Sequence, residues 1–155
     1  MAIGELKDRG GSDDLPPGLR DAVVFIGRAL MAYIFIVEGY GKIVNYSGVA
    51  GYMVDHGVTS ALLPLVILTE LGGGLMILGG LATRWAALAL AGFAVLTAAI
   101  FHSDSADAGQ VINFQKNLAI AGGFLILAAF GPGAWSLEGW RARTKTRQAA
   151  SLPAN

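Results

Sequence analysis

Four long apolar runs dominate this 155-residue chain and restrict it to a membrane fold. They cover roughly residues 22–44, 62–82, 85–101 and 116–134. Each is close to the ~20 residues that a helix needs to cross a hydrocarbon core about 30 Å thick. A soluble four-helix bundle would need a polar face on every helix, and the third run, WAALALAGFAVLTAAIF, has none. The predicted fold class is therefore all-α, an integral membrane four-helix bundle.

The composition agrees with this fold and excludes several classes of function. Charged residues make up 14% of the chain, whereas soluble proteins carry about 25%. Eleven basic residues balance eleven acidic ones, so no excess charge indicates a nucleic-acid partner. The chain has no cysteine and two histidines, His56 and His102. The sequence therefore predicts no intrinsic haem, iron–sulfur or metal centre.

The polar segments define the expected domains and topology. Residues 1–21 form a polar tail, expected to be disordered and to end at a Pro-Pro-Gly breaker; residues 22–138 form the membrane domain, and 139–155 a basic tail. The first run is too long for a signal-peptide core, so we expect it to be retained. Basic residues occur in both tails and at Arg84 but not in the other two connections, which predicts cytoplasmic termini. The run RARTKTR is most simply a topology determinant that also contacts anionic lipid.

Small residues recur along three of the apolar runs and are expected to allow close helix packing. They are Gly72, Gly73, Gly74, Gly79 and Gly80, the pairs Ala87/Ala91 and Ala94/Ala98, and the pair Ala119/Gly123. The same faces would allow a homo-oligomer, although the bundle needs them equally for its own packing.

Four ionisable residues fall inside the apolar runs, where each charge costs at least ~2.5–3.5 kcal/mol at mid-helix. Glu38 and Lys42 stand four residues apart, a spacing that lets them pair on one helix. Glu70 lies in the second run, in the half of the membrane away from the cytoplasm, where Glu38 and Lys42 also fall. Arg28 is near the opposite end of the first run, where we expect its long side chain to reach the cytoplasmic headgroups.

Further polar residues collect at the outer ends of the third and fourth runs, and include His102, Lys116 and Asn117. Two interpretations of the whole cluster stay open. It is either a polar cavity that binds a headgroup such as a quinone and handles its protons, or a buried network of ion pairs that only fixes helix packing. Ion or solute transport is a third, minor interpretation.

Three segments together resemble the DoxX family over residues 24–138. They are Arg28 with EGYGK at 38–42, TELGGGLMILGGLATR at 69–84, and KNLAIAGGFLILAAFGPGAWSLE at 116–138. The matching positions are Arg28, Gly39, Lys42, Glu70, Gly73, Arg84, Lys116 and Asn117. The resemblance implies a small four-helix protein of the bacterial inner membrane, in a family named after a subunit of an archaeal thiosulfate:quinone oxidoreductase. Other members are linked to oxidative-stress complexes. Where many relatives have a histidine, this chain has Glu38.

Two functional hypotheses follow. In the first, the chain is the quinone-interacting membrane subunit of an oxidoreductase or oxidative-stress complex. Glu38 and Glu70 then pass protons as the catalytic residues, and the cofactor-binding residues are Lys42, Asn117, His102 and Lys116. A soluble redox partner or a reduced substrate would supply electrons. In the second, the chain is a non-catalytic membrane scaffold or a transporter of a small or lipid-like solute. The sequence by itself does not decide whether the chain is an enzyme.

Overall fold

The computed structural model describes residues 15–150, and this part of the chain is built from helices without a β-strand. The elements in order are α1 (Pro17–Val44), α2 (Tyr46–Asp55), η1 (Ser60–Leu62), α3 (Leu63–Ile67), η2 (Leu68–Gly72), α4 (Gly73–Gly79), α5 (Thr83–Phe101), α6 (Ala108–Phe130) and α7 (Leu137–Ala150). Four stretches are long and apolar enough to cross a membrane: α1, the composite helix Ser60–Gly79, α5 and α6. The predicted all-α membrane bundle is confirmed.

Two helices start well before the apolar runs that predict them. Helix α1 begins at Pro17, inside the predicted polar tail; proline is well tolerated in a first turn, where its missing N–H has no helical partner. The rest of that tail, residues 1–14, lies outside the described residues. Helix α6 begins at Ala108 rather than near Lys116, because the Asp107 carboxylate accepts hydrogen bonds from the backbone N–H groups of Gly109 (2.7 Å) and Gln110 (3.3 Å).

The second span is a composite helix. It starts with a 3₁₀ turn, continues as α3, widens into a π-helical turn at Leu68–Gly72 and ends as α4. Gly80, in the left-handed region at φ 66°, ends it. The wide turn contains Glu70 and therefore changes the direction in which this side chain points. Such π turns occur frequently at functional sites.

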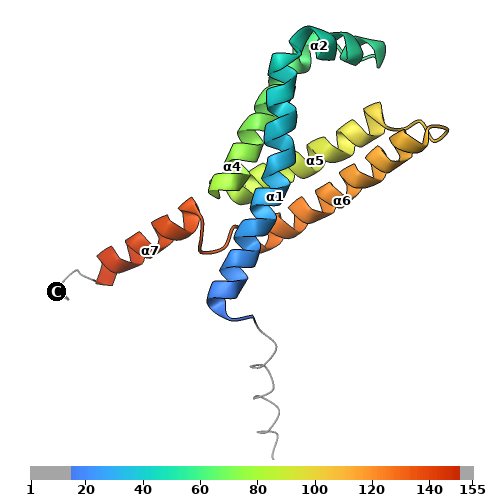
Figure 1. Ribbon diagram of the computed structural model, residues 1–155. Coiled ribbons are helices and arrows are strands. Elements are labelled where there is room, and N and C mark those ends of the chain that lie inside the picture. Colours follow the sequence, from blue (N-terminus) through green and yellow to red (C-terminus); the bar gives the residue numbers. More distant parts are fainter. Residues whose placement is uncertain (1–14, 151–155) are drawn as a thin grey trace, which may run out of the picture.

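The spans form two pairs, α1 with the composite helix and α5 with α6 (Figure 1). The pairs diverge toward the end of the bundle at which α2 lies, called here the α2 end. The opposite end, where α1 begins and α7 leaves the bundle, is called the α7 end.

The core lies where the two pairs cross. Helix α5 contributes more residues to it than any other helix, and its alanines at 87, 91, 94 and 98 are buried, as the small-residue pattern predicts. Phe35 of α1 meets Phe124 of α6 edge to face, with ring centroids 5.3 Å apart. The predicted pair on α6 is only half right: Gly123 packs on Met31, whereas Ala119 is exposed.

The α7 end is held together by polar contacts that the sequence did not reveal. The prediction that Arg28 reaches the headgroups is wrong: its side chain turns inward, is 2% exposed, and donates a hydrogen bond from Nη2 to the carbonyl of Trp135 at 2.6 Å. Helix α7 covers residues 137–150 and thus includes residues 139–150 of the predicted basic tail. Glu138 in its first turn accepts hydrogen bonds from the backbone N–H (2.7 Å) and hydroxyl (3.1 Å) of Thr83.

Candidate functional site

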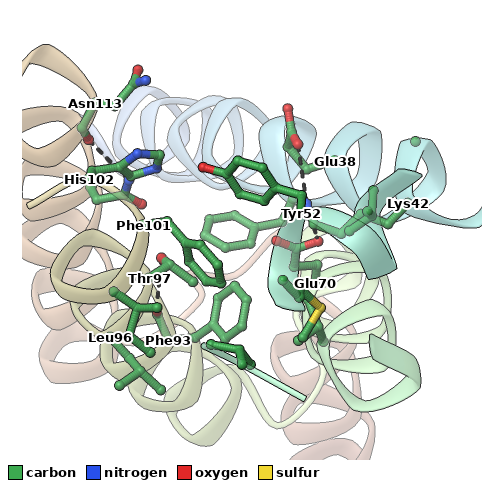
Figure 2. Close-up of a pocket in the computed structure, with 18 of the residues that line it drawn as sticks. Glu38, Lys42, Tyr52, Glu70, Phe93, Leu96, Thr97, Phe101, His102 and Asn113 are labelled. Atoms are coloured by element: carbon green, nitrogen blue, oxygen red, sulfur yellow. Dashed lines mark hydrogen bonds and ion pairs between the residues drawn. The ribbon is translucent and has the colours of Figure 1, made fainter. Parts of the chain in front are cut away.

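A cavity of about 610 Å³ lies between the helix pairs at the α2 end. Its walls come from α1, α2, the composite helix, α5 and α6, and are mainly apolar. All six site residues predicted from the sequence line it: Glu38, Lys42, Glu70, His102, Lys116 and Asn117. Figure 2 shows Glu38, Lys42, Glu70 and His102 among the lining side chains. The structure thus places them around one space; what they do there stays a prediction.

Lys42 joins two carboxylates on one wall of this cavity. Its Nζ lies 3.2 Å from Oε2 of Glu38 and 2.9 Å from Oε2 of Glu70. The exposed side-chain fraction falls from 61% at Glu38 to 19% at Lys42 and 7% at Glu70. These three residues, called here the charged triad, therefore form a continuous polar path from the surface to a buried carboxylate. One ammonium facing two carboxylates also leaves this wall with an excess of negative charge whenever both glutamates are ionised.

Local geometry explains how the triad forms. Glu38 and Lys42 share one face of α1 through their i, i+4 spacing. Glu70 reaches them because its π turn packs very closely on α1 at Gly39. A Cβ atom at Gly39 would lie 2.8 Å from the backbone nitrogen of Leu71. Glycine at position 39 therefore permits the approach that brings Glu70 to Lys42.

His102 and Asn113 lie across the cavity from the triad (Figure 2), and Lys116 and Asn117, which share helix α6 with Asn113, also line the cavity. The ring Nδ1 of His102 lies 2.7 Å from the amide oxygen of Gln110, so the imidazole is already engaged on one side. Asn117 donates one amide N–H to the carbonyl of Asn113 at 3.0 Å, which leaves its second N–H and its oxygen for a ligand. Lys116 is exposed at the edge of this wall.

Aromatic rings lie between the two polar walls. The sequence did not predict these rings as part of the site. Tyr52 stacks on Phe101 with ring centroids 5.6 Å apart and planes inclined by 23°; Phe35 and Phe93 also line the cavity. Tyr52 comes from α2, which lies in the connection between the first two apolar runs. The i, i+4 spacing of Tyr52 and His56 was a signal for a helix there. Their ring centroids lie 4.2 Å apart with the planes inclined by 41°, and His56 itself does not line the cavity.

The arrangement is suited to holding a flat, membrane-soluble molecule with polar atoms at two edges. Aromatic walls accept a planar ring, and polar groups stand on either side of it. Within residues 15–150, no group of three or more His, Cys, Asp or Glu side chains could hold a metal ion.

Comparisons with known proteins agree with the membrane fold. The model of the DoxX family matches residues 23–103. Inner membrane protein YqjF of Escherichia coli is 52% identical over 120 residues, covering 77% of this chain and 92% of the relative. Inner membrane protein YphA of the same organism is 34% identical over 126 residues, covering 77% and 90%. No solved structure gives a significant match.

Proposed function

Because the chain belongs to the DoxX family and is a multi-pass inner-membrane protein, we propose that its cavity binds the headgroup of a membrane quinone. The protein would then be the quinone-interacting subunit of a membrane oxidoreductase or oxidative-stress complex. One observation carries the proposal. A cavity of about 610 Å³ at the α2 end combines apolar, aromatic walls with a triad that runs from a buried to an exposed carboxylate.

The two walls supply the hydrogen-bond donors that such a headgroup needs. Lys42 has an ammonium with three N–H groups, and Asn117 keeps one amide N–H that Asn113 does not use. The walls face each other across aromatic side chains, so one donor can serve each of two carbonyl oxygens on opposite edges of a ring. The surrounding apolar side chains would hold the ring and the start of an isoprenoid tail.

The triad offers a route for protons. Reduction of a quinone to a quinol takes up two electrons and two protons. Glu70 is placed to give a proton to a headgroup oxygen, and the exposed Glu38 can take a replacement from water. Lys42, in contact with both carboxylates, links the two steps. The electrons must come from a partner protein or a reduced substrate, because a chain without cysteine has no ligands for an iron–sulfur cluster.

Binding of menaquinone and ubiquinone to the purified protein in lipid tests the proposal. We compare the wild type with Glu70→Gln and with the double variant Lys42→Met/Glu70→Gln, in which no carboxylate is left buried without its counter-charge. Lys145→Met, on exposed α7, is the matched control for the lysine substitution. We expect saturable binding in the wild type and the control, and at least a roughly tenfold weaker affinity in the double variant, since each lost hydrogen bond to a charged group contributes about 1.5–3 kcal/mol.

Two outcomes contradict the proposal: no saturable binding by the wild type, or undiminished binding by a correctly folded double variant. The main alternative, a non-catalytic scaffold or small-solute transporter, rests on the fact that Lys42 already pairs with both carboxylates without a ligand. If Glu70→Gln prevents the protein from accumulating in the membrane while the wild type binds no quinone, the triad is structural and this alternative is the better account. A soluble oxidoreductase encoded beside the gene would instead favour the first proposal.

A further inference from the structure

Helix α7 leaves the bundle and, after its first turn, packs on no other helix of the described chain (Figure 1). Nearly all residues from Arg141 to Ala150 are exposed. The helix has 14 residues, and an isolated helix of that length is only marginally stable in water. A second surface, outside this chain, would therefore stabilise it.

The first turn of α7 is fixed to the bundle, so its position relative to the membrane is defined. The backbone N–H of Glu138 donates to the carbonyl of Gly80 at 3.1 Å, and its carboxylate accepts from Thr83. Gly80 lies in the turn between the second and third spans, and Thr83 is the first residue of α5. The helix therefore starts level with the end of the transmembrane helices.

Tryptophans mark that level as the interfacial layer of the bilayer. All three in the chain, Trp85, Trp135 and Trp140, lie at the α7 end and are between 53% and 76% exposed. Tryptophan rings favour the headgroup region, where an apolar ring meets a polar environment. Trp140 belongs to α7 itself, which places the first turns of this helix in the same layer.

The side chains of α7 are arranged as in a helix that lies on a charged membrane. Successive residues of a helix lie about 100° apart around its axis. On α7 this spacing places three residues in a strip along one side, and four cations lie beside this strip. The strip consists of Leu137, Trp140 and Thr144. The flanking cations are Arg141 and Lys145 on one side, and Arg143 and Arg147 on the other. Arg143 also donates a hydrogen bond from Nη1 to the carbonyl of Ala134 at 2.9 Å. The sole acidic residue of α7, Glu138, is turned to Thr83 and does not neutralise them.

We propose that α7 is an interfacial helix that binds the phosphate headgroups of anionic phospholipids. Its strip faces the acyl boundary while the flanking cations contact phosphates on both sides. A lipid surface fits better than a soluble acidic protein, because Trp140 and Leu137 on the strip are exposed at the level of the other two tryptophans. This surface lies at the opposite end of the bundle from the cavity and does not depend on the proposed quinone site.

Fluorescence of Trp140 tests the proposal in the full-length protein. Trp85→Phe with Trp135→Phe leaves Trp140 as the reporter, reconstituted in phosphatidylcholine vesicles with or without phosphatidylglycerol. We expect quenching of Trp140 by lipids with brominated acyl chains, and protection from aqueous iodide, to increase with phosphatidylglycerol. Replacing Arg141, Arg143, Lys145 and Arg147 by Gln should reduce this quenching roughly twofold or more, because the attraction to anionic lipid scales with the number of cations near the surface.

The matched control keeps Trp85, on α5, as the reporter. Its quenching should stay the same in both vesicles and in the variant with four glutamines, which shows that the bundle remains inserted. If iodide quenches Trp140 equally with and without phosphatidylglycerol, the proposal is overturned. A soluble acidic protein is then the better candidate for the partner that binds α7. Lipid quenching that is unchanged by the four substitutions overturns the headgroup contacts.

Discussion

At the scale of single residues, Lys42 determines the electrostatics of the cavity. Its ammonium is the group within 4 Å of both Glu38 and Glu70, and the latter is 7% exposed. Removing one partner of a buried ion pair is costly because the remaining charge stays in a medium that solvates it poorly. The two carboxylates would also face each other without a cation between them.

We therefore expect Lys42→Met to destabilise the protein by about 3 kcal/mol, the lower end of the range for breaking a buried ion pair, since Lys42 is partly exposed. Adding Glu70→Gln to the same chain should recover much of this loss, because the charge left behind is removed. Melting temperatures in detergent, measured for both single variants and the double variant, check the coupling. Strictly additive effects would mean that Lys42 and Glu70 do not interact in the folded protein.

At the scale of elements, the contact between α1 and the π turn sets the position of Glu70. Gly39 is buried in this contact, and Gly74 makes a second close approach, where an added Cβ would lie 2.9 Å from Cγ1 of Ile36. Gly41, on the same helix as Gly39, has open space around it. The two glycines of EGYGK therefore have different roles, although the sequence presents them alike.

This difference predicts opposite effects of the same substitution. Gly39→Ala places a Cβ against the backbone of Leu71, which cannot move as a flexible side chain would, and should cost about 1–3 kcal/mol by overpacking. Gly41→Ala should be neutral or stabilising by up to about 1 kcal/mol, since alanine has the higher helix propensity. Thermal unfolding of the two variants, with quinone binding as a second readout, makes the comparison. Equal stability of both variants would show that the α1 contact does not need glycine at position 39.

At the scale of the whole molecule, the two ends of the bundle differ in charge and in the roles proposed for them. Basic residues gather at the α7 end, with Arg84 in the first turn of α5 and four cations on α7. The loop between α5 and α6 at the other end contains Asp104 and Asp107 and no basic residue. The positive-inside rule therefore predicts that the α7 end faces the cytoplasm and that the cavity opens toward the other side.

Single cysteines in this cysteine-free chain can test the topology directly. Ser103→Cys lies in the loop between α5 and α6, and Thr146→Cys lies on α7. In intact cells whose outer membrane is permeabilised, a membrane-impermeant maleimide should label Cys at position 103 and leave position 146 unlabelled until the inner membrane is broken. The reverse pattern would place the α7 end outside and contradict the prediction.

The sequence by itself determined the class of the fold and the chemistry of the candidate site. Hydrophobic runs of membrane-spanning length are a local property, so four spans follow from composition along the chain without knowledge of packing. The cost of burying charge likewise singled out Glu38, Lys42 and Glu70, because ionisable residues persist in spans only for a structural or functional reason. The i, i+4 spacing of Glu38 and Lys42 was enough to predict their pairing.

Only the tertiary structure decided which of these residues meet and around what space. The rotation of each helix, the π turn that directs Glu70, and the divergence of the two helix pairs result from many contacts between distant segments, such as Gly39 with Leu71. The inward turn of Arg28 depends on a carbonyl 107 positions away. Such contacts leave no periodic signal in the sequence, because they are set by the shapes of packed surfaces and not by the polarity of neighbouring residues.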